Sequence, residues 1–342
     1  MSAQKIAFCF PGQGSLEAGM GREIALAVPE AMDVYRRASE ASGLDLVRLC
    51  FEAPEAELVQ TEVQQPALVA TSLAVLAALR ADGFEPDVVV GHSVGEFAAL
   101  AAAQALSIED ALMLVRERGL AMAEAALENP GSMAAILGLE DAVVEALCKE
   151  ISGVWPANYN CPGQIVISGQ DPAVDECCSE AEVHGARRTV KLRVSGAFHS
   201  PLVARAAERL RPAIARAKIN DPIAPFMSTV TAKIEPAQRF ASLLVEQLTA
   251  PVKFTQAARG LVEEGAKVFV EKGFQEPANG FEEARRGAYN PTYLYYTLGK
   301  LEIQELRDEY RSRKGASLQA FHDAFVAQGG LPIALVRRLL FR

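Results

Sequence analysis

One stretch, Pro86 to Ala103, constrains the fold of this chain more than any other. A β-branched run predicts a buried strand over Val88 to Val90, and an alanine-rich run from Phe97 predicts a helix. Between them stands Gly-His-Ser-Val-Gly at 91–95, the G-x-S-x-G pattern. Such a strand-to-helix turn needs glycine on both sides of the serine, because side chains there would collide. The pattern predicts that Ser93 is a nucleophile; the alternative is a turn whose serine only caps a helix.

The composition is that of a soluble globular enzyme. Half of the 342 residues are hydrophobic, 23% are charged and the formal net charge is -9, which argues against nucleic acid as a partner. The apolar run near the start is too short for a signal peptide or a membrane span, and we expect no contact with a membrane. Six cysteines without C-x-x-C spacing predict reduced thiols in a cytoplasmic protein. The four histidines form no H-E-x-x-H cluster, so we expect no catalytic metal.

The order of predicted elements divides the chain into a large and a small unit. A strand at 5–10 leads through a glycine-rich turn into helical stretches up to about residue 82, which we expect to be interrupted at Pro54 and at 64–66. From Gly131 the alternation of strands and helices is typical of a small split-βαβ subdomain inserted into an open α/β layer. Its expected strands are 132–137, 164–168 and 188–194. The predicted units are a large subdomain in two parts, 1–130 and 195–275, a small subdomain, 131–194, and a C-terminal extension, 276–342.

Two further segments could serve a site around Ser93. The turn Pro11–Ser15 is either a plain connection after the first strand, or it presents backbone N–H groups that supply half of an oxyanion hole. Ser107-Ile-Glu-Asp begins a helix with a capping-box pattern. That helix is expected to run to about Leu127 and carries Arg116 and Arg118.

Four separated motifs resemble those of the malonyl-CoA:acyl carrier protein transacylases and the acyltransferase domains of polyketide synthases. They are Phe10–Ser15, Gly91–Glu96, Arg118–Gly119 and Ala197–Pro201. Two other segments match the same family, 158–164 and 247–252, and the order and spacing agree over about residues 4–271. The resemblance implies an α/β-hydrolase-like large subdomain with a parallel sheet, an inserted ferredoxin-like small subdomain, and a site between them.

The resemblance also implies a reaction, a ping-pong transfer. Ser93 would attack the thioester of malonyl-CoA, CoA would leave, and the phosphopantetheine thiol of an acyl carrier protein would take the malonyl group. No cofactor belongs to the enzyme itself, since phosphopantetheine is carried by the partner. The product would feed fatty acid or polyketide biosynthesis.

Family members provide the base for this reaction at the position of His199. They orient its imidazole with the main-chain carbonyl of the residue that matches Gln247, rather than with an aspartate. Phe198 matches the malonyl-type pattern, in which a bulky ring disfavours a 2-methyl branch. From the residues alone, the alternative for His199 is a loop histidine that caps the following helix. His92 is expected to play only a supporting part.

Charge stabilisation is implied for three more residues. The oxyanion donors would be the backbone N–H groups of Gln13 and Val94. Arg118 matches the residue that pairs with the free carboxylate of malonate, because a planar guanidinium offers two parallel hydrogen bonds that lysine cannot reproduce. From the residues alone, Arg118 would instead be a solvated helix arginine, as we expect for Arg116.

The family pattern ends soon after Glu271, where a glycine-proline-glycine turn is replaced by Lys-Gly-Phe-Gln-Glu-Pro. The extension 276–342 is expected to be helical and resembles the C-terminal end of a helical, zincin-like family of uncharacterised peptidase-type proteins. The metal motif of that family is absent here, so no peptidase function is carried over. His322 is expected to be structural or solvated.

Two alternative functions remain open at this point. A serine hydrolase of acyl thioesters or acyl carriers would share the G-x-S-x-G turn, because water can replace the pantetheine thiol. Arg118 argues against it, since simple acyl chains carry no carboxylate for this residue to neutralise. An inactive interaction module, damaged by the altered C-terminus, is the non-enzymatic alternative.

Overall fold

The computed structural model describes residues 5–271 together with Tyr310, Ser312, Arg313 and Ser317. The chain divides into two compact units, Met1–Val268 and Phe269–Arg342. Nearly all of the predicted extension, including His322, lies outside the described residues. Of its four described residues, Tyr310, Ser312 and Arg313 are helical. The account below therefore concerns the first unit and the strand that crosses its boundary.

A five-stranded sheet carries the stretch around Ser93. Its strand order is β8-β7-β2-β1-β9, and the strands are β1 (Lys5–Phe10), β2 (Val88–Gly91), β7 (Phe226–Ser228), β8 (Lys233–Glu235) and β9 (Ala266–Glu271). β2 runs parallel to β1 and to β7, and β8 is antiparallel to β7. In the β1–β2 register Phe10 lies opposite Gly91. Both strands therefore end at the same edge, and the turns that follow them emerge side by side.

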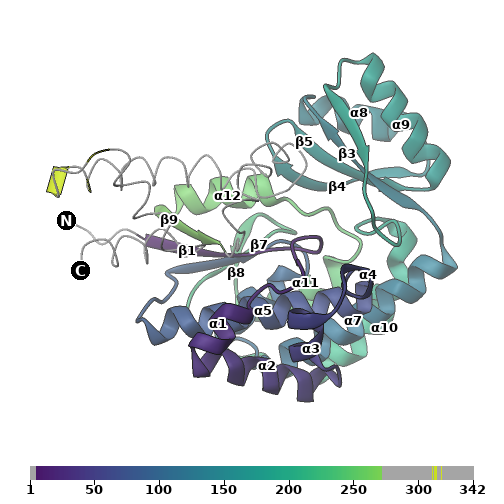
Figure 1. Cartoon of the computed structure of the whole chain (residues 1–342). Helices are drawn as coiled ribbons and strands as arrows, with labels where there is room; N and C mark the ends of the chain where they lie inside the picture. The colour runs from purple at the N-terminus through teal and green to yellow at the C-terminus, as the bar shows by residue number, and fades with distance from the viewer. Residues whose placement is uncertain (1–4, 272–309, 311, 314–316, 318–342) are drawn as a thin grey trace. The chain divides into compact units, whose positions relative to one another are not determined.

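Helices cover both faces of this sheet, with α12 on one face and α5 with α7 on the other (Figure 1). The helices α2, α5 and α7 also pack on one another. The helices of residues 5–130 and 195–271 are α1 (Arg22–Ala27), α2 (Pro29–Ser42), α3 (Leu46–Glu52), α4 (Glu55–Leu58), α5 (Thr61–Ala81), α6 (Gly95–Ala102), α7 (Ile108–Glu128), η1 (Pro201–Val203), α10 (Ala204–Arg216), α11 (Ala237–Glu246) and α12 (Phe254–Glu263).

Helix α5 runs through the interruption expected at 64–66, so that prediction was wrong. Pro66 lies inside the helix and lacks the N–H that would bond the carbonyl of Glu62 four residues earlier. Arg116 Nη1 donates to that carbonyl instead, at 2.7 Å. The carbonyl is therefore satisfied from the neighbouring helix, and Arg116 is half-buried rather than solvated.

By length and composition alone, α5 is also the one helix among the described residues that could cross a membrane. Its most apolar window is 83% buried inside the protein. The apolar side chains of this helix thus belong to the core, where α5 packs against α2 and α7.

A four-stranded sheet lies within the segment predicted as the small subdomain. Its elements are β3 (Ser132–Leu137), α8 (Asp141–Glu150), β4 (Val154–Cys161), β5 (Gln164–Gly169), α9 (Asp171–Val183) and β6 (Arg188–Lys191). The strand order is β4-β5-β3-β6, with every pair antiparallel. Figure 1 shows α8 and α9 on one face of this sheet, where they close a core with the inward side chains of the strands. This βαββαβ arrangement is ferredoxin-like, which confirms the predicted fold class.

The sequence analysis missed the edge strand β4. Pro156 cannot donate to a ladder, and the register shifts at Pro156/Asn158 and again at Tyr159/Cys161, which hides the alternation of an ordinary strand. The outer edge of β4 is covered by residues that follow α11. Tyr159 N donates to Val252 O and Val252 N donates to Ala157 O, each at 2.8 Å. These bonds tie the small sheet to a segment nearly a hundred residues later in the chain.

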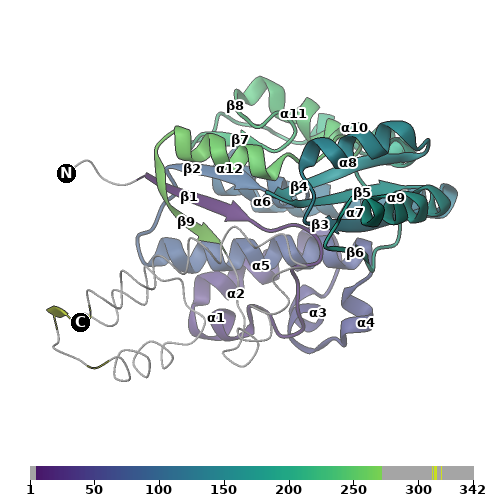
Figure 2. The ribbon, with the colours of Figure 1, turned by 90° about the horizontal axis from the view of Figure 1, so that it is seen from above.

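The two sheets also meet near Ser93. His92 Nε2 and Asn160 Oδ1, which belong to the turn after β2 and to β4, are 3.0 Å apart. Figure 2 shows β1 running toward the four-stranded sheet. The turns after β1 and β2 therefore lie where the two sheets meet.

We expect Gly95→Ala to lower the free energy of unfolding by about 1–3 kcal/mol, the usual cost of forcing extra atoms into a packed site. A Cβ at Gly95 would collide with the main-chain oxygens of Phe10 and Pro11. The matched control is Gly260→Ala in α12, where the nearest atom is the flexible Cε of Met227 at 3.1 Å and alanine favours the helix. Urea denaturation of both variants measures the difference. Equal stability of Gly95→Ala and the wild type would contradict the close contact between α6 and the end of β1.

Candidate active site

Ser93 lies at the turn from β2 into α6 with a positive φ of 53°. Gly91 and Gly95 permit this turn, because a Cβ at Gly91 would collide with the backbone of Gly95 and Glu96. The side chain of Ser93 does not cap α6: the N-cap residue is Val94, and no side-chain capping bond is formed there. The hydroxyl instead faces His199 and Arg118. The capping alternative for Ser93 is therefore wrong.

His199 provides a basic nitrogen at hydrogen-bond distance from the serine. Ser93 Oγ and His199 Nε2 are 2.8 Å apart, although 106 residues separate them in the chain. His199 Nδ1 lies 2.8 Å from the main-chain oxygen of Gln247 and 3.2 Å from that of Ala250. A carbonyl oxygen only accepts, so Nδ1 carries the proton and Nε2 is left to accept from the serine hydroxyl. This tautomer is the one a general base needs.

His199 is not the cap of the following helix. That cap is Ser200, whose Oγ accepts from Leu202 N at 3.3 Å. The pKa of His199 is lowered to about 3. Burial is the largest cause, followed by the positive charge of Arg118 and by the neighbouring His92. The imidazole is therefore neutral at physiological pH, and its Nε2 keeps the lone pair that accepts from the Ser93 hydroxyl.

Arg118 is buried, with 1% of its surface exposed, and is not the solvated helix arginine that the residues alone would suggest. Its Nη1 donates to Gln65 Oε1 at 2.7 Å, and its Nη2 donates to Ser93 Oγ at 3.0 Å and to Gln247 Oε1 at 3.2 Å. Its Nε has no hydrogen-bond partner. Burial lowers the pKa of Arg118 to about 9, and Glu96 opposes this shift. The guanidinium thus stays charged at neutral pH, held by two neutral amides.

The N–H groups of Gln13 and Val94 lie on the two turns that leave β1 and β2 side by side. In residues 5–271 neither amide donates to another protein group. The side chain of Gln13 is anchored away from the turn, since its Nε2 donates to Thr61 Oγ1 and its Oε1 accepts from Gln65 Nε2, each at 3.2 Å. These two N–H groups are therefore left without a protein acceptor in the described residues.

Phe198 is buried beside His199, with 4% of its surface exposed. Its backbone N–H donates to Gly196 O at 3.1 Å, so it belongs to the tight loop that also sets the positive φ of 57° at His199. No hydrogen bond or ring contact joins its ring to the described site residues.

Two buried side chains of the site escaped the sequence analysis. Gln65 was assigned only to an expected break in a helix, yet it holds both Arg118 and Gln13. Glu96 was quoted only as the end of the serine motif, yet it is fully buried, and burial raises its pKa to about 7. The sequence signals available were a polar residue before Pro66 in an otherwise apolar stretch, and a carboxylate directly after the G-x-S-x-G pattern.

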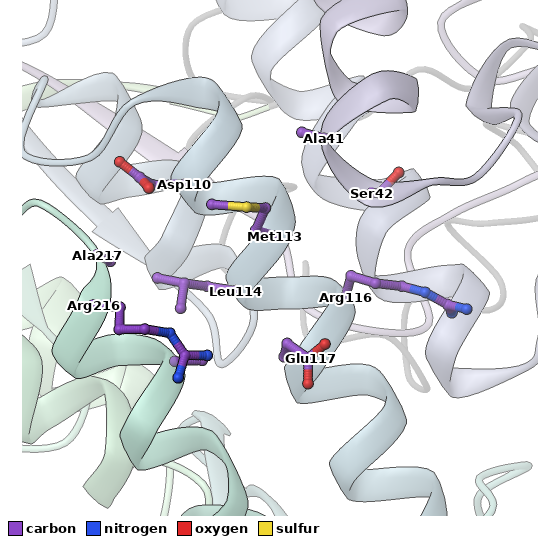
Figure 3. Close-up of a pocket in the computed structure, with 10 residues that line it drawn as sticks. Ala41, Ser42, Asp110, Met113, Leu114, Arg116, Glu117, Arg216 and Ala217 are labelled. Atoms are coloured by element: carbon purple, nitrogen blue, oxygen red, sulfur yellow. The ribbon is translucent and has the colours of Figure 1, made fainter.

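A separate hollow of about 330 Å³ lies away from these residues. Figure 3 shows its lining, which comes from α2, α7 and α10 and includes Asp110, Arg116 and Arg216. None of the residues assigned to the site lines it. In the described part of the chain, no cluster of three or more His, Cys, Asp or Glu side chains is placed to hold a metal ion.

The arrangement of Ser93, His199 and Arg118 defines the class of site. A hydroxyl beside a neutral, carbonyl-oriented imidazole can form an ester with an acyl group. A buried cation 3.0 Å from that hydroxyl favours an acyl group that carries negative charge. This is the site of a serine-dependent acyl-group transferase or hydrolase on an α/β fold.

The chain belongs to the acyl transferase domain family, whose model matches residues 7–275, and the predicted family is confirmed. It is 43% identical over 274 residues to the malonyl CoA-acyl carrier protein transacylase of Bacillus subtilis, covering 79% of this chain and 86% of that protein. It also resembles the crystal structure of a malonyl-CoA:acyl carrier protein transacylase from Xanthomonas oryzae, with a TM-score of 0.76, 41% identity, and 79% and 88% of the two chains covered.

A second similar structure contains a type II PKS acyl-carrier protein in complex with its malonyl-transacylase. The TM-score is 0.76, the identity is 36%, and 78% of this chain and 88% of that chain are covered. A second family model, described as a bacterial protein of unknown function, matches residues 257–340. It covers the segment in which the sequence departs from the acyl transferase pattern.

We expect His199→Gln to make the stability of the protein less sensitive to acid. The pKa of His199 is lower in the folded chain than in the unfolded chain, so on acidification the unfolded chain takes up the proton first. The free energy of unfolding therefore falls from about pH 6.5 toward pH 3, by at most about 1.4 kcal/mol per pH unit from this group. Urea denaturation between pH 6.5 and 4.5 should give a steeper loss for the wild type than for His199→Gln.

The matched control for this measurement is His184→Gln. His184 is exposed at the end of α9, where its Nδ1 lies 2.8 Å from Glu180 O. This control should keep the wild-type slope. Parallel slopes for the wild type and His199→Gln would contradict a buried, neutral imidazole.

Proposed function

We propose that this protein transfers the malonyl group of malonyl-CoA to the phosphopantetheine thiol of an acyl carrier protein, through an ester on Ser93. One observation carries the proposal: Ser93 Oγ is shared by a basic nitrogen of His199 at 2.8 Å and by a buried guanidinium of Arg118 at 3.0 Å. A nucleophile at that position suits an acyl group that ends in a carboxylate. The names of the relatives and their nearly full-length match support the same activity.

The first half of the reaction forms the ester. His199 Nε2 takes the proton of Ser93 as its oxygen attacks the thioester carbonyl, and the carbonyl oxygen becomes an oxyanion. The N–H groups of Gln13 and Val94 bind this oxyanion; losing one such donor costs about 10²–10³ in rate. The C–S bond then breaks, and the CoA sulfur takes the proton from His199.

The second half reverses these steps with another thiol. The phosphopantetheine sulfur gives its proton to His199 and attacks the ester carbonyl, and the bond to Ser93 Oγ breaks as the proton returns to it. The chain supplies nucleophile, base and oxyanion donors, so the reaction needs no cofactor beyond the group that the carrier protein brings. A cytoplasmic location accompanies this function, since none of the six cysteines forms a disulfide and reduced thiols persist in a reducing compartment.

Substrate choice depends on Arg118 and Phe198. Arg118 pairs with the free carboxylate of the malonyl group, while Gln65 and Gln247 hold its guanidinium in place. Phe198, buried next to His199, restricts a 2-methyl branch, although one methyl group is worth only about 1–3 kcal/mol. Acetyl groups are refused because they leave the buried cation without an anion.

We expect Arg118→Ala to lose malonyl transfer and to gain activity on acetyl-CoA. Removing the guanidinium removes the partner of the malonyl carboxylate and also the cost of leaving a buried charge unpaired beside an acetyl group. The ratio of kcat/KM for malonyl-CoA to that for acetyl-CoA should fall by about 100-fold or more, the scale of a lost charge-assisted pair. Arg116→Ala, two residues away on the same helix, should keep the wild-type ratio. Unaltered use of malonyl-CoA by Arg118→Ala would contradict the carboxylate assignment.

The activity itself is tested with labelled malonyl-CoA, with and without holo-carrier protein. Label should appear on the enzyme without carrier, move to the carrier when it is added, and be absent from Ser93→Ala. Hydrolysis without transfer would instead identify a serine hydrolase. No labelled enzyme at all would leave an inactive interaction module.

A further inference from the structure

Glu96 occupies an unusual place for a carboxylate. It stands three residues after Ser93, in the first turn of α6, and is fully buried. Its Oε1 accepts from Thr229 N at 2.7 Å, Thr229 Oγ1 at 2.9 Å and Ser228 Oγ at 3.3 Å. Its Oε2 accepts from Gln247 Nε2 at 3.1 Å. Among the described residues Glu96 forms no salt bridge. Its carboxylate is held by hydrogen bonds, and the charge of Arg118 stabilises it without direct contact.

Gln247 connects this carboxylate to Arg118. Its side-chain Nε2 donates to Glu96, and its Oε1 accepts from Arg118 Nη2 at 3.2 Å. A carboxylate only accepts and a guanidinium only donates, so the amide can take just one of its two orientations. The main-chain oxygen of the same residue accepts from His199 Nδ1 at 2.8 Å. One residue thus contacts the carboxylate, the arginine and the histidine.

We propose that Glu96 is a positioning residue for recognition of the malonyl carboxylate, acting through the amide of Gln247 to orient Arg118 without neutralising it. The inference rests on the proposed function and deepens it. A carboxylate in direct contact with Arg118 would occupy the guanidinium that the substrate needs. With a neutral amide between them, the guanidinium keeps its charge, and its Nε has no protein partner.

Protonation of Glu96 would reverse this arrangement. A proton on Oε2 turns the acceptor of the Gln247 amide into a donor. The Gln247 amide would then turn its carbonyl oxygen toward Glu96 and its NH₂ group toward Arg118. Two hydrogen-bond donors would face each other there, which is unfavourable. The orientation of Arg118 therefore depends on the ionised state of Glu96.

Among the buried titratable groups of this cluster, Glu96 is the one whose charge changes near neutral pH. Burial raises its pKa to about 7, against the opposing effects of its bonds to Thr229 and Ser228 and of Arg118. Of the charged or titratable groups around it, Arg118 has a pKa of about 9 and stays charged. His199 has a pKa of about 3 and stays neutral, and burial also lowers the pKa of His92.

The principal test is Glu96→Gln, which keeps the shape of the side chain and removes its charge. We expect KM for malonyl-CoA to rise about 10- to 100-fold, as for loss of a hydrogen bond to a charged group, with a smaller change in kcat. The inhibition constant of acetyl-CoA should change little, because that ligand has no carboxylate for Arg118. A merely structural role would lower kcat or the active fraction and leave both constants unchanged, and that result would overturn the proposal.

Glu109→Gln is the matched control, since Glu109 also lies in the first turn of a helix but pairs with Arg37 at the surface. It should behave as the wild type. The wild-type enzyme provides a second test if Glu96→Gln does not fold. Between pH 8 and pH 6, KM for malonyl-CoA should rise relative to the inhibition constant of acetyl-CoA, which shares the CoA phosphates. A ratio that does not change with pH would overturn the proposal.

Failure of the proposed function would look different. In that case the wild-type protein would form no malonyl ester on Ser93 at any pH. If the ester forms and Glu96→Gln keeps the wild-type KM and the wild-type preference for malonyl over acetyl, only the role of Glu96 is wrong.

Discussion

The buried charge of Arg118 is the constraint around which the site is built. A guanidinium removed from water without a carboxylate partner is costly, and here it is held by the amides of Gln65 and Gln247. Burial of the imidazole is the main cause of the lowered pKa of His199, and the charge of Arg118 is the second. Together they keep the imidazole neutral. The charge of Arg118 also limits the rise in the pKa of Glu96. Arg118, His199 and Glu96 are therefore electrostatically coupled within one buried cluster.

Backbone strain accompanies this cluster. Ser93 and His199 have φ angles of 53° and 57°, a region that costs a non-glycine residue about 1–3 kcal/mol. The surrounding structure overrides that cost at both positions. Gly91 and Gly95 allow α6 to start against the end of β1, and Ser200 anchors the loop of His199 through Ala197 O at 2.6 Å. The strained turns aim two side chains, 106 residues apart in the chain, at one another.

The small sheet contributes position rather than chemistry. Strand β4 bonds to the segment around Val252, just beyond Gln247, and Asn160 bonds to His92 beside the serine. The carbonyl that orients His199 thus lies on a segment tied to both sheets.

Local patterns in the sequence determined the elements and the chemistry at their ends: the β-branched run before Gly91, the glycines around Ser93 and the capping Ser107, which accepts from Asp110 N at 2.9 Å. These signals depend on neighbouring residues only, so they could be interpreted without a fold. The family resemblance added His199, Arg118 and Gln247. Only the tertiary structure decided that Pro66 continues a helix and that a bulged β4 is a strand, because the groups that satisfy them lie on distant segments. Only the tertiary structure identified the hydrogen-bond partners of Glu96 and Gln65 in the site. The direction of a buried hydrogen bond depends on which donors and acceptors the fold brings together.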